Sequence, residues 1–145
     1  TLLPSRERLL GYQQGLKKHG IKPESSYVVS TDLSATKTAD AIHKLLALRN
    51  RPTAVITFND YVALDAMKYV KSLGLKINKD IDFVSFANLP VTSYLDHPPV
   101  ASVEQFPYQQ AEKATEILLQ LINKQEAVPS PHRFVMEARL VVNKG

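Results

Sequence analysis

The chain has 145 residues, no cysteine and a formal net charge of +4 at pH 7. This length suits one core, and the absence of cysteine excludes a disulfide scaffold and a thiolate metal site. No apolar run approaches the roughly 18 residues of a membrane-spanning helix, and the basic residues are dispersed rather than gathered into a nucleic-acid-binding stripe. We expect a globular protein of the reducing cytoplasm.

The chain begins Thr-Leu-Leu-Pro-Ser-Arg-Glu-Arg, without a Met and without the layout of a signal peptide, so we expect a fragment of a longer protein. Apolar periodicity then predicts a helix from Arg6 to His19, which Gly20 ends. Gly11 and Gly15 lie one turn apart inside it. Because an interior Gly costs about 1 kcal/mol against Ala, this spacing predicts close packing of the helix on a sheet.

The next segment predicts a short strand, a polar corner and a second helix. Tyr27 to Ser30 has strand character, Thr31 to Thr36 is polar, and Lys37 to Leu48 is amphipathic. The expected inward face of this helix contains Ala39, Ile42 and Leu46.

The segment from Arg51 to Gly74 predicts one strand–corner–helix unit. Ala54 to Phe58 is almost wholly apolar, as in a strand covered on both faces. Asn59 is a candidate helix N-cap, and Asp60 suits the positive end of the helix. Gly74 suits the residue just past the helix end, where φ is often positive. The expected apolar stripe contains Val62, Ala66, Tyr69, Val70 and Leu73.

The remaining half of the chain predicts two strands, a helix and a final strand. The strands are 81–87 and 100–104, separated by a proline-rich loop at 88–99. A strong helix follows at 108–124, with a break at 128–131 and a loosely alternating strand at 133–142. The inward residues of the helix at 108–124 should be Ala111, Ala114, Leu118, Leu121 and Ile122. Alternating strands and helices of this length predict an α/β fold with a mostly parallel sheet.

The sequence contains no recognisable catalytic or metal-binding motif. It has no glycine-rich phosphate loop, no Gly-x-Ser-x-Gly elbow, and no pair of its four histidines at metal-binding spacing. We therefore expect no catalytic residue, no metal and no cofactor, and a protein that is not an enzyme.

Polar residues instead follow each of the first three predicted strands. Asp32 follows the first, Asn59 the second and Asn88 the third, and Arg8 opens a helix that should itself follow a strand. The carboxyl ends of parallel strands form one edge, where ligands bind in α/β proteins. The set predicts a site for a small polar ligand. A plain helix cap at Asn59 and a surface salt bridge at Arg8 remain open alternatives.

Several of these segments together resemble the effector-binding region of the LacI/GalR family of transcription regulators. The order and spacing of the segments carry the resemblance, which runs from Arg8 to about Ile122. The matching pieces are Arg8-x-x-Gly11-Tyr12 with Gly20-Ile21; Pro52-Thr-Ala-Val-Ile-Thr-Phe-Asn-Asp60 with Ala63-Leu64; Gly74 with Asp80-Ile-Asp-Phe-Val-Ser-Phe86; Pro98-Pro-Val-Ala-Ser-Val-Glu-Gln105; and Ala114 with Leu118-Leu119.

The resemblance implies a periplasmic binding protein-like type I fold, with three-layer α/β lobes on either side of a ligand cleft. It implies that residues 1–101 form most of the C-terminal lobe, that 102–132 cross to the N-terminal lobe, and that 133–145 return. The DNA-binding helix-turn-helix domain would be absent from this chain. The helix at 108–124 would then lack its sheet partner, so we expect its apolar stripe to dock on a neighbouring molecule or to pack differently.

The resemblance also assigns roles to single residues. Arg8 matches the arginine that contacts the effector, Asn59 the asparagine that binds ligand hydroxyls, and Gln105 a crossover residue near the cleft. Leu33 falls near a position that often holds a stacking aromatic.

One departure from the family pattern concerns the end of the third strand. The family usually has an acid where this chain has Ala87, so a carboxylate that accepts two sugar hydroxyls is missing, and Asn88 is the neighbouring candidate to replace it. A phosphosugar, a nucleobase or a protein co-regulator therefore becomes an alternative to a hexose.

The resemblance thus implies an effector-sensing domain of a bacterial regulator, acting as a homodimer. Its effector would be a small polar molecule such as a sugar, and it would control operator binding by the absent domain. A transport-type sugar-binding protein of the same fold, and a small α/β enzyme, are the alternatives.

Overall fold

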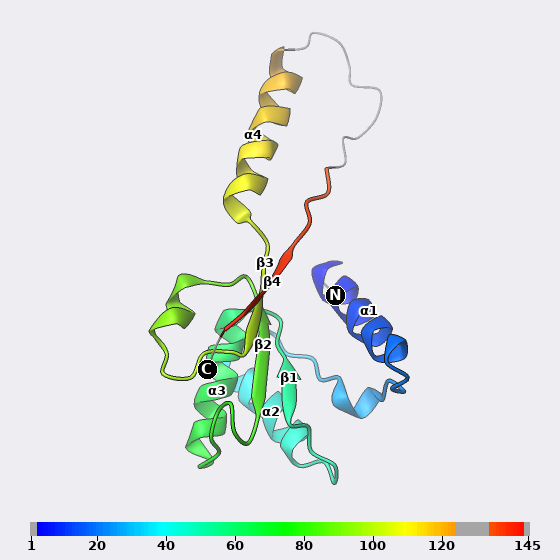
Figure 1. Ribbon diagram of the computed structural model, residues 1–145, viewed down its shortest axis with the longest axis vertical. Helices are drawn as coiled ribbons and strands as arrows, with labels where there is room; N and C mark the ends of the chain where they lie inside the picture. Colours follow the sequence, from blue (N-terminus) through cyan, green and yellow to red (C-terminus); the bar gives the residue numbers. More distant parts are fainter. Residues whose placement is uncertain (1–2, 124–133, 144–145) are drawn as a thin grey trace.

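The computed structural model describes residues 3–123 and 134–143 of the chain (Figure 1). None of the described helices is long and apolar enough to cross a membrane. The elements in chain order are α1 (Leu3–Lys18), a 3-10 turn (Ser25–Tyr27), α2 (Ala35–Leu46), β1 (Ala54–Ile56), α3 (Asp60–Ser72), β2 (Asp82–Phe86), a second 3-10 turn (Pro90–Tyr94), β3 (Ala101–Glu104), α4 (Pro107–Asn123) and β4 (Arg139–Val142).

The four strands form one sheet in the order β1-β2-β3-β4. The first three are parallel, and β4 runs antiparallel to β3, with Glu104 opposite Arg139. This arrangement confirms the α/β class, the mostly parallel sheet and its flanking helices. The carboxyl ends of β1, β2 and β3 consequently meet at one edge.

The core lies between the sheet and the helix pair α2 and α3. Phe83 at the centre of β2 is fully buried, and α3 packs on both β2 and α2. The buried cluster consists of Ile42, Leu45, Ala66, Met67, Val70, Ile77, Ile81 and Phe83.

The ends of α2 and α3 follow from local sequence. Asn59 is the N-cap of α3, because its Oδ1 accepts from the backbone N of Val62 at 2.9 Å. Ser34 caps α2 in the same way, through Lys37 N. Gly74 has φ +78°, as predicted for the residue beyond a helix end.

The predicted inward faces of these two helices were partly wrong. On α2 the buried residues are Thr38, Ala41, Ile42 and Leu45, so the prediction was right for Ile42, while Leu46 is only partly buried against the core and Ala39 is not part of it. On α3, Leu73 is 50% exposed. The helices pack on each other as well as on the sheet, which rotates the buried stripe relative to a simple helix-on-sheet contact.

The strand predicted at Tyr27 to Ser30 was wrong. Tyr27 ends a 3-10 turn, and the following residues form no ladder. Consequently β1 pairs with β2 alone among the described strands, and its other edge is open. Its predicted burial on both faces was also wrong, since Ala54 and Ile56 are exposed.

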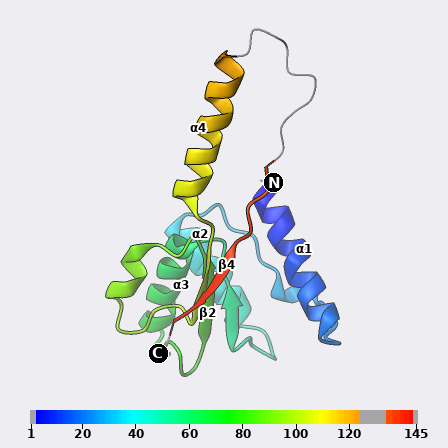
Figure 2. The same ribbon diagram turned by 45° about the horizontal axis from the view of Figure 1, so that its top comes forward.

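Helix α1 stands beside the open edge of β1 rather than on the sheet (Figure 2). It has no buried residue, and a Cβ added at Gly11 or Gly15 would meet no atom within 4 Å. The close packing predicted from the glycine spacing was therefore wrong.

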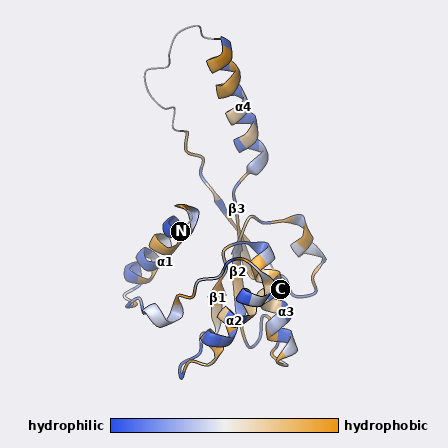
Figure 3. Ribbon diagram, turned by 180° about the vertical axis from the view of Figure 1, so that it is seen from behind, coloured by the Kyte–Doolittle hydropathy of each residue, from blue (hydrophilic) through white to orange (hydrophobic). Residues whose placement is uncertain are grey.

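Helix α4 extends away from the sheet and also has no buried residue (Figures 1 and 3). Its apolar side chains Leu118, Leu119 and Ile122 are more than half exposed. This exposure agrees with the expectation that α4 lacks a sheet partner, while docking on a neighbour stays a prediction. Of the last predicted strand only 139–142 forms a ladder. The break predicted at 128–131, Lys124 and Arg133 lie outside the described residues.

Candidate functional site

Arg8 is held at the carboxyl edge of the sheet between two aromatic rings. Its guanidinium carbon lies 4.4 Å from the ring centroid of Phe58, after β1, and 4.2 Å from that of Phe86, at the end of β2. Nη1 donates to the carbonyl oxygen of Phe58 at 2.6 Å. Nη2 lies 3.5 Å from Oε1 of Gln105, which follows β3. One side chain of α1 thus contacts the end of β2 and the segments that follow β1 and β3.

The burial of the guanidinium lowers the pKa of Arg8, because a charged group loses hydration when it is covered. A guanidinium stays protonated in proteins and carries five N–H donors. The contacts with Phe58 and Gln105 engage two of its nitrogens, so further N–H groups remain to bind a ligand. The two rings fix the plane of the fork through cation–π contacts.

Asn59 follows Phe58 directly and points one end of its amide into α3. Because the cap engages Oδ1, the Nδ2 amino group is the part that can donate to a ligand. A cap and a ligand contact are therefore compatible in the same side chain.

Asn88 is held against Glu104 at the ends of β2 and β3. Its Nδ2 donates to Oε2 of Glu104 at 3.0 Å, and its backbone N donates to Oγ of Ser102 at 3.0 Å. The bond from Asn88, followed by that from the backbone N of Phe106, holds the pKa of Glu104 below its usual value. Asn88 and Glu104 also line an open cavity of about 380 Å³.

Arg139 approaches the same end of the sheet from β4. It pairs with Glu104 in the ladder, and its guanidinium carbon lies 5.5 Å from the ring centroid of Phe106. A carboxylate and a second guanidinium therefore border the edge that Arg8 occupies. Neither Glu104 nor Arg139 was predicted for the site, because Arg139 approaches Glu104 only through the antiparallel pairing of β4 with β3.

Asp60 has a larger role than the helix-end contact predicted for it. Its side chain is fully buried, and its carboxylate accepts from the hydroxyls of Ser85 and Ser102, the latter at 3.2 Å. It also accepts from the backbone N of Leu89 at 2.6 Å. Asp60 thereby ties α3 to β2, to β3 and to the loop that begins with Asn88.

Backbone strain gathers at this edge. Ala87 has φ +98°, Asn88 φ +52° and Phe106 φ +54°, all immediately after strands. Non-glycine residues avoid this region, and they cluster at functional sites where the surrounding structure holds them. Leu33 is a further example, with φ +71°.

Asp32 and Leu33 are not brought into the Arg8 group. Oδ1 of Asp32 accepts from the hydroxyl of Ser34 at 2.6 Å and from its backbone N at 2.9 Å, which lowers the pKa of Asp32. In the described residues neither residue hydrogen-bonds to Arg8, Gln105 or Asn88. The candidate site consists of Arg8 with Asn59, Asn88 and Gln105, which follow the ends of β1, β2 and β3, whereas Asp32 organises the start of α2.

The side chains at this edge are suited to the recognition of a polar ligand. In residues 3–123 and 134–143, no group of three or more His, Asp or Glu side chains is placed to hold a metal ion. The site offers guanidinium and amide donors, aromatic faces and one carboxylate, a set suited to hydroxyl, carboxylate or phosphate groups.

Known proteins and one protein family are similar to this chain over most of its length. Residues 2–144 match the family described as a periplasmic binding protein-like domain. The chain is 33% identical over 135 residues to the HTH-type transcriptional repressor CytR of Escherichia coli K12, which covers 93% of this chain and 39% of CytR. It is 30% identical over 137 residues to the HTH-type transcriptional repressor PurR of Vibrio vulnificus, covering 94% and 40%.

Two solved structures extend the similarity to three dimensions. A putative LacI transcriptional regulator from Bacillus cereus subsp. cytotoxis superposes with a TM-score of 0.85 at 25% identity, covering 95% of this chain and 48% of that one. A putative ribose operon repressor from Burkholderia thailandensis gives 0.82 at 27% identity, covering 98% and 50%. The chain spans about two fifths of the length of the curated relatives it matches.

Proposed function

Because the chain belongs to the effector-binding region of the LacI/GalR family of transcription regulators, we propose that its carboxyl edge binds a small polar effector, a sugar or sugar derivative. The contacts of Arg8 carry this proposal. A guanidinium clamped between Phe58 and Phe86, and in reach of Gln105, is oriented before a ligand arrives, so little side-chain entropy is lost on binding.

The donors at this edge favour an effector rich in acceptor oxygens. Arg8 and Asn59 supply N–H groups, while Ala87 supplies no carboxylate to accept sugar hydroxyls. A phosphosugar fits a guanidinium fork better than a neutral hexose does, because charge-assisted bonds to phosphate are stronger. Glu104 is the nearest acceptor for a hydroxyl, with Asn88 fixing its carboxylate.

The arrangement of the lobes is part of the proposal. Residues 1–101 form most of one lobe, 102–132 enter the other and 133–145 return. Helix α4, which leaves the sheet with an exposed apolar stripe, supports this division. In the whole protein the effector would close the two lobes and alter operator binding by a homodimer.

Isothermal titration calorimetry on the full-length protein tests the site, with a panel of sugars, phosphosugars and nucleobases. An effector should lose roughly 1–3 kcal/mol of binding free energy in Arg8→Ala and in Asn59→Ala, because a buried polar partner is left unpaired. Arg6→Ala is the matched control, since Arg6 lies on the same helix and is exposed. Unchanged affinity in both site variants would refute the assignment.

The regulatory part of the proposal needs a separate measurement. Fluorescence anisotropy of labelled operator DNA should change when the effector is added to the parent protein, and should not change with Arg8→Ala at the same concentration. Absence of binding across the whole panel would instead favour a protein co-regulator.

A further inference from the structure

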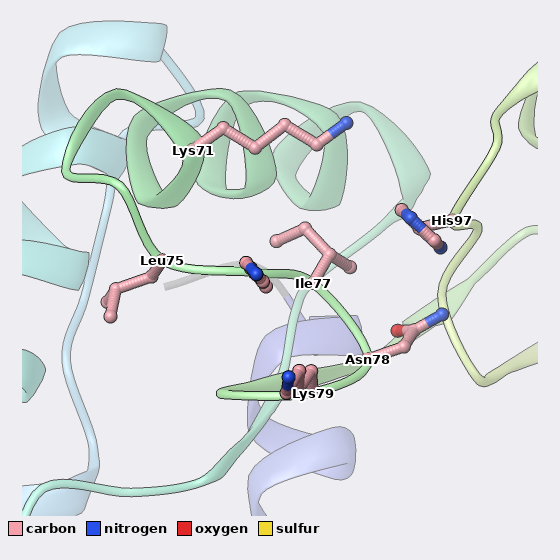
Figure 4. A pocket seen from close by; sticks show the side chains of 7 residues that line it. Lys71, Leu75, Ile77, Asn78, Lys79 and His97 are labelled. Carbon is pink, nitrogen blue, oxygen red and sulfur yellow. The ribbon is translucent and has the colours of Figure 1, made fainter.

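A second cavity lies at the opposite edge of the sheet from Arg8. It is open, has a volume of about 530 Å³, and is formed by the end of α3, the connection to β2 and the loop before β3 (Figure 4). The candidate effector site does not include it. Three lysines and a histidine line it, namely Lys71, Lys76, Lys79 and His97.

The three lysines are not used in ion pairs within the described chain. The two salt bridges there join Lys37 to Asp40 and Lys113 to Glu116. Lys71 lies in the last turn of α3, where a cation also offsets the negative helix end. Lys76 and Lys79 lie beyond the helix and have no such role.

The turn that carries Lys76 and Lys79 is fixed by hydrogen bonds. Oδ2 of Asp80 accepts from the backbone N of Lys76 at 2.7 Å, and the backbone N of Asp80 donates to the carbonyl of Lys76 at 2.8 Å. The nearest carboxylate in the sequence is thus engaged by the backbone. Lys76 and Lys79 therefore lie on a turn that is held by these hydrogen bonds.

The lining of the cavity also includes two apolar residues and an asparagine that is fixed by a hydrogen bond. Leu75 and Ile77 provide the apolar part. Nδ2 of Asn78 donates to the carbonyl of Pro98 at 2.9 Å, which joins the two walls. Its Oδ1 is buried without a hydrogen-bond donor in the described residues, and Figure 4 shows this oxygen turned toward Ile77. Because this oxygen is buried, it is not exposed to a ligand in the open cavity.

We propose that this cavity binds a small organic anion, a carboxylate or phosphate ester with an apolar body. The lysines pair with the anion, and Leu75 and Ile77 contact the apolar body. A ligand in this cavity would contact both α3 and the loop before β3, at the edge of the sheet opposite the candidate effector site.

Nuclear magnetic resonance titration of the 15N-labelled chain tests the proposal with three probes. Mandelate carries a carboxylate, phenyl phosphate a phosphate ester, and mandelamide is the neutral analogue of mandelate. At least one anion should shift the amides of residues 75–79 and 97 in a saturable way, and mandelamide should not. The anion that binds more tightly shows whether the cavity prefers a carboxylate or a phosphate ester.

The variant K71Q/K76Q/K79Q should weaken that binding about tenfold or more, because the charge-assisted contacts are removed. These lysines are exposed, so the variant should fold like the parent. K17Q/K18Q/K22Q removes the same charge elsewhere and should leave the dissociation constant unchanged. No saturable shifts, equal shifts with mandelamide, or equal weakening in both variants would overturn the proposal.

Discussion

The carboxylate of Asp60 accepts a hydrogen bond of 2.6 Å from the backbone amide of Leu89, 29 residues further along the chain. The same carboxylate accepts from Ser85 in β2 and from Ser102 in β3. One buried side chain therefore joins α3 to β2, to β3 and to the loop that follows β2. The strained residues Ala87 and Asn88 lie directly before this contact. Asp60 therefore fixes the backbone next to Asn88, a residue of the candidate site.

We expect Asp60→Ala to lower the free energy of unfolding by about 3 kcal/mol, because two hydroxyls and an amide would be buried without an acceptor. Urea denaturation followed by circular dichroism measures this loss. Asp65→Ala, on the same helix and partly exposed, is the control and should change little. Equal stability of the Asp60 variant and the parent would show that water replaces the carboxylate.

Asn59→Asp should separate the two roles of Asn59. An aspartate oxygen also caps a helix, so the free energy of unfolding should stay within about 0.5 kcal/mol of the parent. The Nδ2 donor is lost, so effector affinity should fall roughly tenfold. Parallel denaturation and calorimetry give both values. A variant that loses stability but keeps its affinity would leave Asn59 with the cap alone.

Glu104 should make stability depend on pH in acid. Its pKa is lowered in the folded protein, first by the bond from Asn88, so its contribution is present above the unfolded pKa of about 4.3. That contribution is lost as pH falls through the lower folded pKa. Glu104→Gln should therefore lose less stability than the parent when the pH is lowered through this window.

Thermal unfolding at a series of pH values, from neutral to strongly acidic, checks this dependence on Glu104. Glu112→Gln removes an exposed glutamate of α4 and should follow the parent curve. Parallel curves for Glu104→Gln and the parent would contradict the prediction.

Ala87→Gly should stabilise the fold. Ala87 has φ +98°, a conformation that glycine adopts without a Cβ penalty, so the gain should be about 1 kcal/mol. The greater freedom of glycine in the unfolded chain offsets part of it. Chemical denaturation measures the change, and Ala63→Gly, inside α3, should be destabilising by comparison. A loss of stability at position 87 would mean that the methyl group packs usefully.

Features that depend on neighbours in sequence could be predicted from the sequence alone. The Asn59 cap and the Gly74 helix end follow from hydrogen bonds within a few turns of chain, and the mostly parallel sheet was predicted from the alternation of strands and helices. The family resemblance, confirmed by the comparisons, extends this local information to the whole fold.

The location of the candidate site at the carboxyl edge of the sheet could be predicted from the sequence, but the contacts within it could not. Four of the six expected ligand residues, Arg8, Asn59, Asn88 and Gln105, lie there, because strand order alone brings the carboxyl ends of parallel strands together. Their role in ligand binding stays a prediction.

Only the tertiary structure decided which groups touch. The strand at 27–30 failed because a ladder needs a partner, and no described strand lies beyond β1. The contacts of Phe58 and Phe86 with Arg8, and the hydrogen bond between Asp60 and Leu89, join residues 29 to 78 positions apart. Such contacts depend on how the elements pack, and packing is a property of the whole chain that no local pattern of residues contains.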